Sequence, residues 1–97
     1  IIMDPPSFGH GPKDELWKIE AHFLELMELC KQILSDEPLF GLINGYTAGY
    51  SPIAYKNNLI DMMESNIGTI EIGELVIKQT KSDKLLPCGI FARWERN

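Results

Sequence analysis

The sequence IIMDPPSFGH, residues 1–10, begins with three apolar residues, which are followed by the charged Asp4 and two prolines. The run is typical of a strand buried on both faces in a parallel sheet. Pro5 and Pro6 end this strand, because proline cannot donate a hydrogen bond to a neighbouring strand. The prolines also stiffen the turn and leave carbonyl oxygens free as acceptors. Residues 7–12 are rich in glycine and proline, which predicts an irregular loop.

The following segments predict two helices separated by a second apolar strand. Apolar residues recur at steps of three and four over residues 13–34, which indicates an amphipathic helix. Residues 39–44 form another apolar run of strand length. Ser51 is a favoured N-cap residue and Pro52 suits the first helical position. These two residues predict a second helix over residues 52–66.

The last third of the sequence predicts a hairpin. Apolar residues alternate over residues 69–78 and 88–94, and the polar residues 80–84 lie between them. The element order is therefore strand, helix, strand, helix, strand, strand. This order predicts an α/β fold whose first two strands are parallel and joined by a right-handed crossover. The last two strands are expected to form an antiparallel hairpin at one edge of the sheet.

Composition limits the class of protein. The 97 residues suffice for one domain, spanning residues 1–97, and 44% of them are hydrophobic. No apolar run is long enough to cross a membrane. The net charge of −5 argues against nucleic-acid binding by this segment alone. Cys30 and Cys88 are expected to be reduced, buried thiols in a cytoplasmic protein, and no cysteine or histidine spacing predicts a metal site.

The unusual polar residues follow the two parallel strands. Functional groups in open α/β sheets lie beyond the carboxyl ends of the strands. We therefore expect Asp4, Asn44 and Tyr46 to lie at one edge of the sheet. A carboxylate there can accept hydrogen bonds from an amino group, and Phe8 can stack on a planar ring. The alternative is that Asp-Pro-Pro only ends a strand, and the motif alone does not decide between the two.

Three stretches of the sequence carry a family resemblance: residues 3–34 (MDPPSFGHGPKDELWKIEAHFLELMELCKQIL), 38–52 (PLFGLINGYTAGYSP) and 73–94 (GELVIKQTKSDKLLPCGIFARW). Together they resemble class I S-adenosylmethionine-dependent methyltransferases, in particular the bacterial group related to ribosomal-RNA large-subunit methyltransferases. In that family the Asp-Pro-Pro segment follows the fourth strand, and two helices and three strands complete the sheet. The resemblance implies the C-terminal half of a Rossmann-like methyltransferase domain. We therefore expect the N-terminal, cofactor-binding half to be absent and the chain alone to be inactive.

The resemblance also implies roles for individual residues. Asp4, Pro5 and Pro6 would form the catalytic segment beside the sulfonium end of S-adenosylmethionine, with Asp4 and Pro5 contacting the cofactor. The substrate side would include Phe8, His10, Asn44 and Tyr46. His10 is the one candidate general base, although a loop histidine is more often simply exposed to solvent. Ser7 stands where the amino-directed members of the family place their aromatic residue, which weakens the stacking role of Phe8.

RNA is the substrate that the resemblance implies. Methylation of cytosine carbon 5 requires a cysteine thiolate that adds to the base. In the relatives that do this, the cysteine commonly follows the fifth strand, where this chain has Asn44 to Thr47. A nitrogen or oxygen target is therefore favoured over cytosine carbon 5.

A non-catalytic α/β module that binds a protein partner is the alternative function. The two hypotheses differ at the first strand, because an exposed strand edge invites association. A methyltransferase fragment would pair there with its missing half or with a second copy of itself. An interaction module would cover this edge within the chain.

Overall fold

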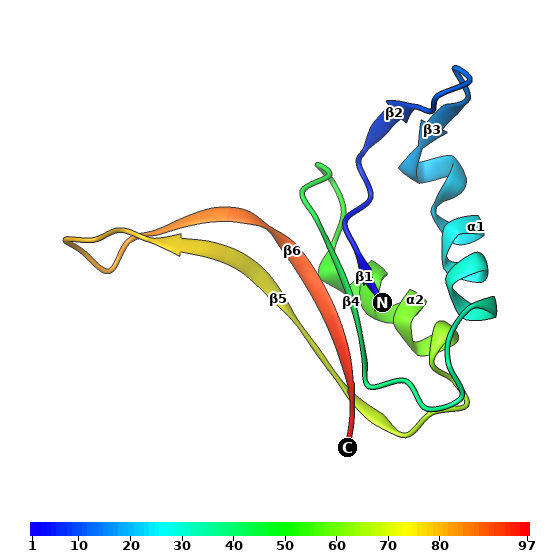
Figure 1. The fold of residues 1–97 in the computed structure, drawn as a ribbon. Coiled ribbons are helices and arrows are strands. Elements are labelled where there is room, and N and C mark those ends of the chain that lie inside the picture. The colour runs from blue at the N-terminus through cyan, green and yellow to red at the C-terminus, as the bar shows by residue number, and fades with distance from the viewer.

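A computed structural model describes residues 1–97 as a mixed sheet with two helices packed beside each other (Figure 1). Neither helix has the length and apolar character that crossing a membrane requires. The elements in chain order are β1 (Ile2–Met3), β2 (Phe8–His10), β3 (Leu16–Lys18), α1 (Ile19–Gln32), β4 (Phe40–Gly45), α2 (Pro52–Met62), β5 (Gly68–Lys78) and β6 (Leu85–Arg96).

The main sheet has four strands in the order β1-β4-β6-β5. Strand β1 is parallel to β4, whereas β6 is antiparallel to both of its neighbours. This arrangement confirms the predicted α/β fold, with a parallel first pair and an antiparallel C-terminal hairpin. The hairpin enters the sheet through β6, so that β5 and β1 are the two edge strands.

The core lies between the helices and one face of the sheet. It is a single cluster of 12 buried hydrophobic residues. Helix α1 contributes Phe23 and Cys30, and Cys30 contacts Met3 of β1. Helix α2 contributes Tyr55 and Leu59, both 0% exposed. Burial of each large apolar side chain stabilises the fold by about 1.5–3 kcal/mol, so this layer holds the sheet and helices together.

The first helix begins later than its periodicity predicts. Residues 13–34 were expected to be helical and residues 7–12 irregular, but β3 pairs antiparallel with β2 in a two-stranded ribbon before α1 starts at Ile19. Asp14 adopts a left-handed backbone conformation, with φ of 61°. An L-residue in this conformation cannot continue an α-helix, and the chain therefore turns back at Asp14.

Other predicted features also need correction. Helix α2 ends at Met62 rather than at residue 66, and β6 covers residues 85–96 rather than 88–94. Ile2 is 64% exposed because β1 has one buried face and not two: the helices cover the face that carries Met3 and leave the opposite face open. Cys30 is buried as expected, but Cys88 is exposed. Both thiols are free.

Candidate functional site

The carboxyl ends of β1 and β4 bring Asp4 and Asn44 into contact. The parallel register pairs Met3 with Ile43, which places the residues that follow them side by side. Nδ2 of Asn44 donates a hydrogen bond to Oδ1 of Asp4 over 3.0 Å. The Asp4 side chain is exposed, and its other carboxylate oxygen is free to accept from a ligand. The expected placement of both residues at one edge of the sheet is confirmed, while their roles stay predictions.

A second polar contact links the two loops further along. The hydroxyl groups of Ser7 and Thr47 lie 2.7 Å apart, and the two residues are separated by 40 positions, as Asp4 and Asn44 are. The parallel register of the strands therefore continues into the loops. Two hydrogen bonds hold the loops side by side and restrict their movement.

The Asp-Pro-Pro segment is fixed from its other side by the β2–β3 ribbon. Pro5 is buried, and the indole Nε1 of Trp17 donates to the carbonyl oxygen of Pro6 over 2.7 Å. The backbone N–H of Ile19 donates to the carbonyl oxygen of Ser7 over 3.1 Å. The expectation that both proline carbonyls are free acceptors is therefore wrong for Pro6, because β3 returns alongside it.

The aromatic candidates lie at the same end of the sheet and are open to solvent. Phe8 is 57% exposed and meets the ring of His10 edge-on, with 5.4 Å between the ring centroids. Tyr46, in the loop after β4, is 77% exposed. The β2–β3 ribbon that carries Phe8 and His10 extends from the end of the sheet where β1 finishes (Figure 1). Nδ1 of His10 lies 3.1 Å from the carboxylate of Asp14, so its nearest acidic partner is Asp14 and not Asp4.

Tyr55 is buried beneath the end of β4 at this edge of the sheet. Its side chain is 0% exposed, and its hydroxyl has no hydrogen-bond partner within the chain. A Cβ added to Gly45, at the end of β4, would lie 2.5 Å from that hydroxyl. Burial raises the pKa of the Tyr55 phenol, and the nearby Tyr50 and Asp4 raise it further. Tyr55 is therefore a neutral phenol packed directly under the strand that carries Asn44.

The two thiols of the chain have different surroundings. The Cys30 sulfur is buried 3.6 Å from the sulfur of Met3, and burial raises the pKa of its thiol. Cys88 lies on β6 beyond the end of β4. No group of three or more histidine, cysteine or acidic side chains is placed to hold a metal ion.

Three residues of this region were not recognised as part of the site from the sequence: Trp17, Thr47 and Tyr55. Thr47 had a usable signal, because it follows Asn44 at the same distance as Ser7 follows Asp4. The partner of Trp17 depends on the β2–β3 ribbon, which the helical periodicity does not predict. The position of the Tyr55 hydroxyl follows only from the packing of α2 under β4.

Comparison with known proteins finds similarity among solved structures. No protein-family model and no curated protein matches the chain. Among solved structures, the chain is similar to a SAM-dependent methyltransferase from Agrobacterium tumefaciens, with 29% sequence identity and a TM-score of 0.88. The match covers 99% of this chain and 32% of the Agrobacterium chain. The chain thus spans about one third of the length of that enzyme and has the fold of that part.

Proposed function

We propose that this chain forms the C-terminal part of the catalytic domain of an S-adenosylmethionine-dependent methyltransferase, with the Asp4–Asn44 edge as its catalytic face. The similarity to the Agrobacterium methyltransferase over nearly the whole chain carries this proposal. The contact between Asp4 and Asn44 supports it, because both residues follow parallel strands at the edge where α/β enzymes place reacting groups. Strand β1 is an edge strand, as this hypothesis expects and the interaction-module alternative does not.

The residues at this edge suit a cationic methyl donor. S-adenosylmethionine supplies an activated methyl group on a positively charged sulfur. The exposed carboxylate of Asp4 offers one free oxygen and a negative charge, and the buried Pro5 offers an apolar wall beside it. Asp4 and Pro5 are therefore the proposed cofactor contacts on this chain. The two loop-to-loop hydrogen bonds would hold Asp4 in position toward the acceptor atom.

RNA is the proposed substrate. Phe8 and Tyr46 are exposed aromatic rings that can stack on bases, each such contact being worth about 1–3 kcal/mol. Because the chain has a net charge of −5, its contacts with RNA are proposed to involve bases rather than phosphates. A nitrogen or oxygen target is favoured over cytosine carbon 5, since Cys30 is buried and no cysteine is present among residues 44–47 after β4. Asn44 and His10 complete the proposed substrate side.

We also propose how the protein associates and where in the cell it lies. The free edge of β1 offers unpaired backbone groups, which suits self-association or pairing with further strands of the same sheet. The cytoplasm is the proposed location, in keeping with two free thiols.

The test measures methyl transfer from tritiated S-adenosylmethionine to ribosomal RNA by the protein, in the longest form that its gene encodes. We expect Asp4→Asn to lower turnover by about 10²-fold or more, because it removes the charge that faces the reacting groups. The fold should be unaffected, since the Asp4 side chain is exposed. Asp36→Asn is the matched control, because Asp36 is an exposed aspartate in the loop before β4.

Equal turnover of Asp4→Asn and the control would remove Asp4 from the mechanism. Absence of S-adenosylmethionine binding by calorimetry would reject the methyltransferase assignment itself. Methyl transfer to protein or small molecules, with none to RNA, would keep the enzyme class and reject the substrate.

A further inference from the structure

The β5–β6 hairpin extends beyond the rest of the sheet. The last residue pair between β4 and β6 is Gly45 with Ile90, whereas β5 and β6 continue to pair as far as Lys78 with Leu85. We call residues 75–89, including the connecting loop, the arm. Figure 1 shows the arm projecting from the body of the protein, away from α1 and α2. No residue of the arm is buried.

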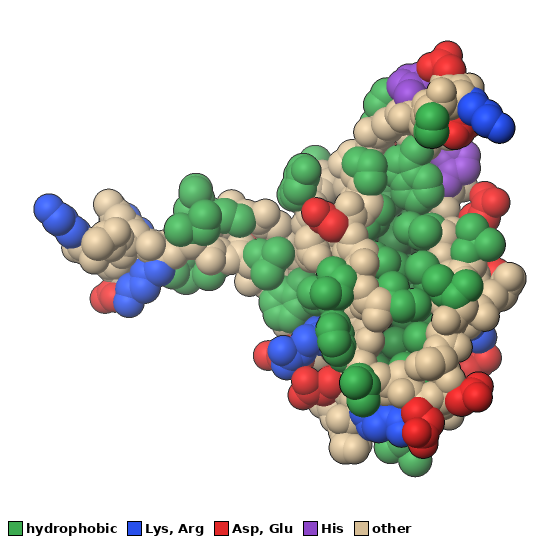
Figure 2. Space-filling model, in the orientation of Figure 1, with side chains coloured by type: hydrophobic (Ala, Val, Ile, Leu, Met, Phe, Trp, Pro, Cys, Tyr) green, Lys and Arg blue, Asp and Glu red, His purple; other side chains and the backbone are tan.

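Apolar side chains cover both faces of the arm. Ile77 is paired with Leu86 and the adjacent Val76 with Pro87, and neighbouring pairs point to opposite faces of a ribbon. The exposed fractions of Val76, Ile77 and Leu86 are 46%, 61% and 61%. Figure 2 shows hydrophobic side chains along the projecting ribbon. An isolated two-stranded ribbon is only marginally stable, and an exposed apolar patch marks a surface that binds a partner.

The faces of the arm, rather than its edges, are suited to this contact. Pro87 removes a hydrogen-bond donor from the outer edge of β6, and a bulge at Cys88, between the pairs Leu75–Gly89 and Val76–Pro87, interrupts the same strand. Both features oppose the addition of a further strand at the β6 edge of the arm. A partner is therefore expected to pack on side chains and not to extend the sheet.

The tip of the arm has the opposite charge to the rest of the chain. It carries Lys78, Lys81 and Lys84, with Asp83 as its only acid. Asp83 lies 3.2 Å from the amino group of Lys78, which leaves Lys81 and Lys84 without an ionic partner in the chain. Because the whole chain has a net charge of −5, the body that remains is strongly acidic.

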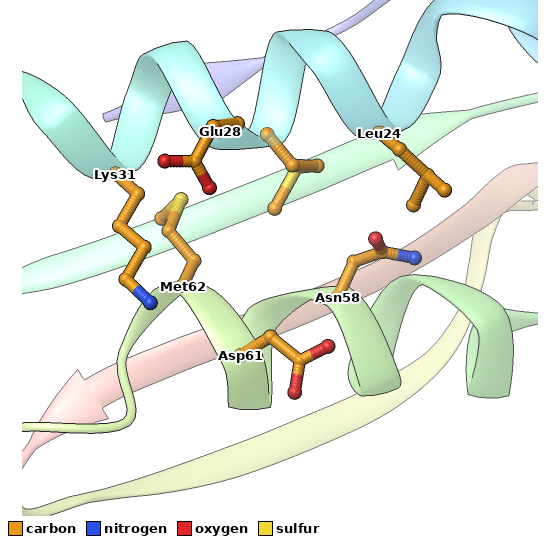
Figure 3. A pocket seen from close by; sticks show the side chains of 7 residues that line it. Leu24, Glu28, Lys31, Asn58, Asp61 and Met62 are labelled. Atoms are coloured by element: carbon orange, nitrogen blue, oxygen red, sulfur yellow. The ribbon is translucent and has the colours of Figure 1, made fainter.

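The groove between α1 and α2 offers the complementary surface. Figure 3 shows Glu28 of α1 and Asp61 of α2 at this groove, together with Leu24 and Met62. The hollow has a volume of about 220 Å³, enough for side chains but not for a strand. Neither Glu28 nor Asp61 forms an ion pair within the chain, whereas Lys31 beside them is already paired with Glu64.

We propose that the arm docks on a second copy of this chain, with Lys81 and Lys84 at the α1–α2 groove of the other copy. The arm points away from the groove of its own chain, so the contact is between molecules (Figure 1). A two-fold arrangement lets each copy give one arm and receive one, which closes the assembly as a dimer. The apolar faces of both arms are then covered against the partner. This proposal does not depend on the methyltransferase assignment.

Sedimentation equilibrium tests the proposal with two charge reversals. Lys81→Glu/Lys84→Glu gives an acidic arm, and Glu28→Lys/Asp61→Lys gives a basic groove. Each variant alone brings like charges together, and we expect its dimer dissociation constant to rise by at least about 10-fold at low salt. An equimolar mixture of the two variants restores complementary charges at both contacts. We expect the mixture to form a heterodimer as tight as the wild-type dimer.

The control is Lys13→Glu/Lys18→Glu. It lowers the net charge by the same amount as the arm variant, but on exposed residues of the β2–β3 region. It should leave the dimer unchanged, and far-UV circular dichroism should show the same fold for every variant. A wild-type monomer at all concentrations overturns the proposal, as does a dimer that neither reversal weakens. Loss of RNA binding in the arm variant, with no change in mass, also overturns it and assigns the arm to nucleic acid.

Discussion

Strand β6 belongs to two regions that differ in what covers their side chains. In the body, Ala92 and Trp94 are 0% and 2% exposed, because the helices pack over this part of the sheet. In the arm, Leu85 and Leu86 of the same strand are 55% and 61% exposed. Backbone pairing with β5 continues through both regions. Pairing alone therefore forms the ribbon, whereas side chains are buried only where a helix covers the sheet.

The candidate site lies at the covered region. Asp4 is exposed and Asn44 is half-buried, and each directly follows a buried residue, Met3 and Ile43 respectively. Two long-range hydrogen bonds then tie the loops together. A catalytic edge needs this kind of support, because reacting groups must be held near a productive geometry. The arm has no buried residue to support its side chains, which suits a segment that becomes ordered when a partner binds.

Truncation of one isoleucine in each region is expected to give the largest contrast. Ile43 is 0% exposed between β1 and β6, and Ile77 is 61% exposed in the arm. Ile43→Ala should lower the free energy of unfolding by about 2–5 kcal/mol, since it leaves a cavity in the core. Ile77→Ala should change it by no more than about 0.5 kcal/mol in the monomer. Urea denaturation measures both, and similar losses would show that the arm is packed in solution.

A smaller effect is expected where β4 meets α2. Gly45→Ala adds a Cβ that would lie 2.5 Å from the Tyr55 hydroxyl, which should destabilise the protein by about 1–3 kcal/mol. Combining it with Tyr55→Phe should recover most of this loss, because the clashing oxygen is gone. Gly9→Ala is the control, since its added Cβ would meet nothing nearer than 3.9 Å. Additive effects in the double variant would contradict the proposed contact.

The smallest expected effect is the alkaline pH dependence of the body. Burial raises the pKa of Tyr55 above its ordinary value of 10.0, so the folded state favours the neutral phenol. Its contribution to stability is fully present below the unfolded pKa and is lost as the pH rises through the folded pKa. Tyr55→Phe should therefore weaken the loss of stability above about pH 10. Chemical denaturation across this range, for wild type and variant, checks it; identical curves would contradict it.

The sequence predicted the order of the main elements and the edge that carries the polar residues. The Ser51-Pro52 signal was sufficient for α2, and the structure shows the Ser51 hydroxyl accepting from the backbone N–H of Ile53. Parallel pairing of the first two strands followed from the helix between them. Their parallel direction was enough to expect Asp4 near Asn44, because the carboxyl ends of neighbouring parallel strands lie together.

The β2–β3 ribbon could not be predicted from periodicity. Leu16 and Ile19 are three residues apart, which fits a helix as well as the observed strand-to-helix transition. The true start of α1 has no side-chain cap at Lys18, so the usual N-cap signal is missing. Instead, the backbone N–H of Lys18 donates to Nδ1 of His22. The exposure of the arm could not be predicted either, because an apolar strand has the same sequence pattern whether or not a helix covers it.

The indole-to-carbonyl contact between Trp17 and Pro6 lets fluorescence report on the Asp-Pro-Pro segment. The chain has two tryptophans, and the other, Trp94, is 2% exposed in the core. Trp17 is half-buried and bonded to the segment that carries Asp4. A compound that shifts this segment would change the emission of Trp17 and leave that of Trp94 constant. The protein thus contains its own pair of optical reporters, one for the loop and one for global unfolding.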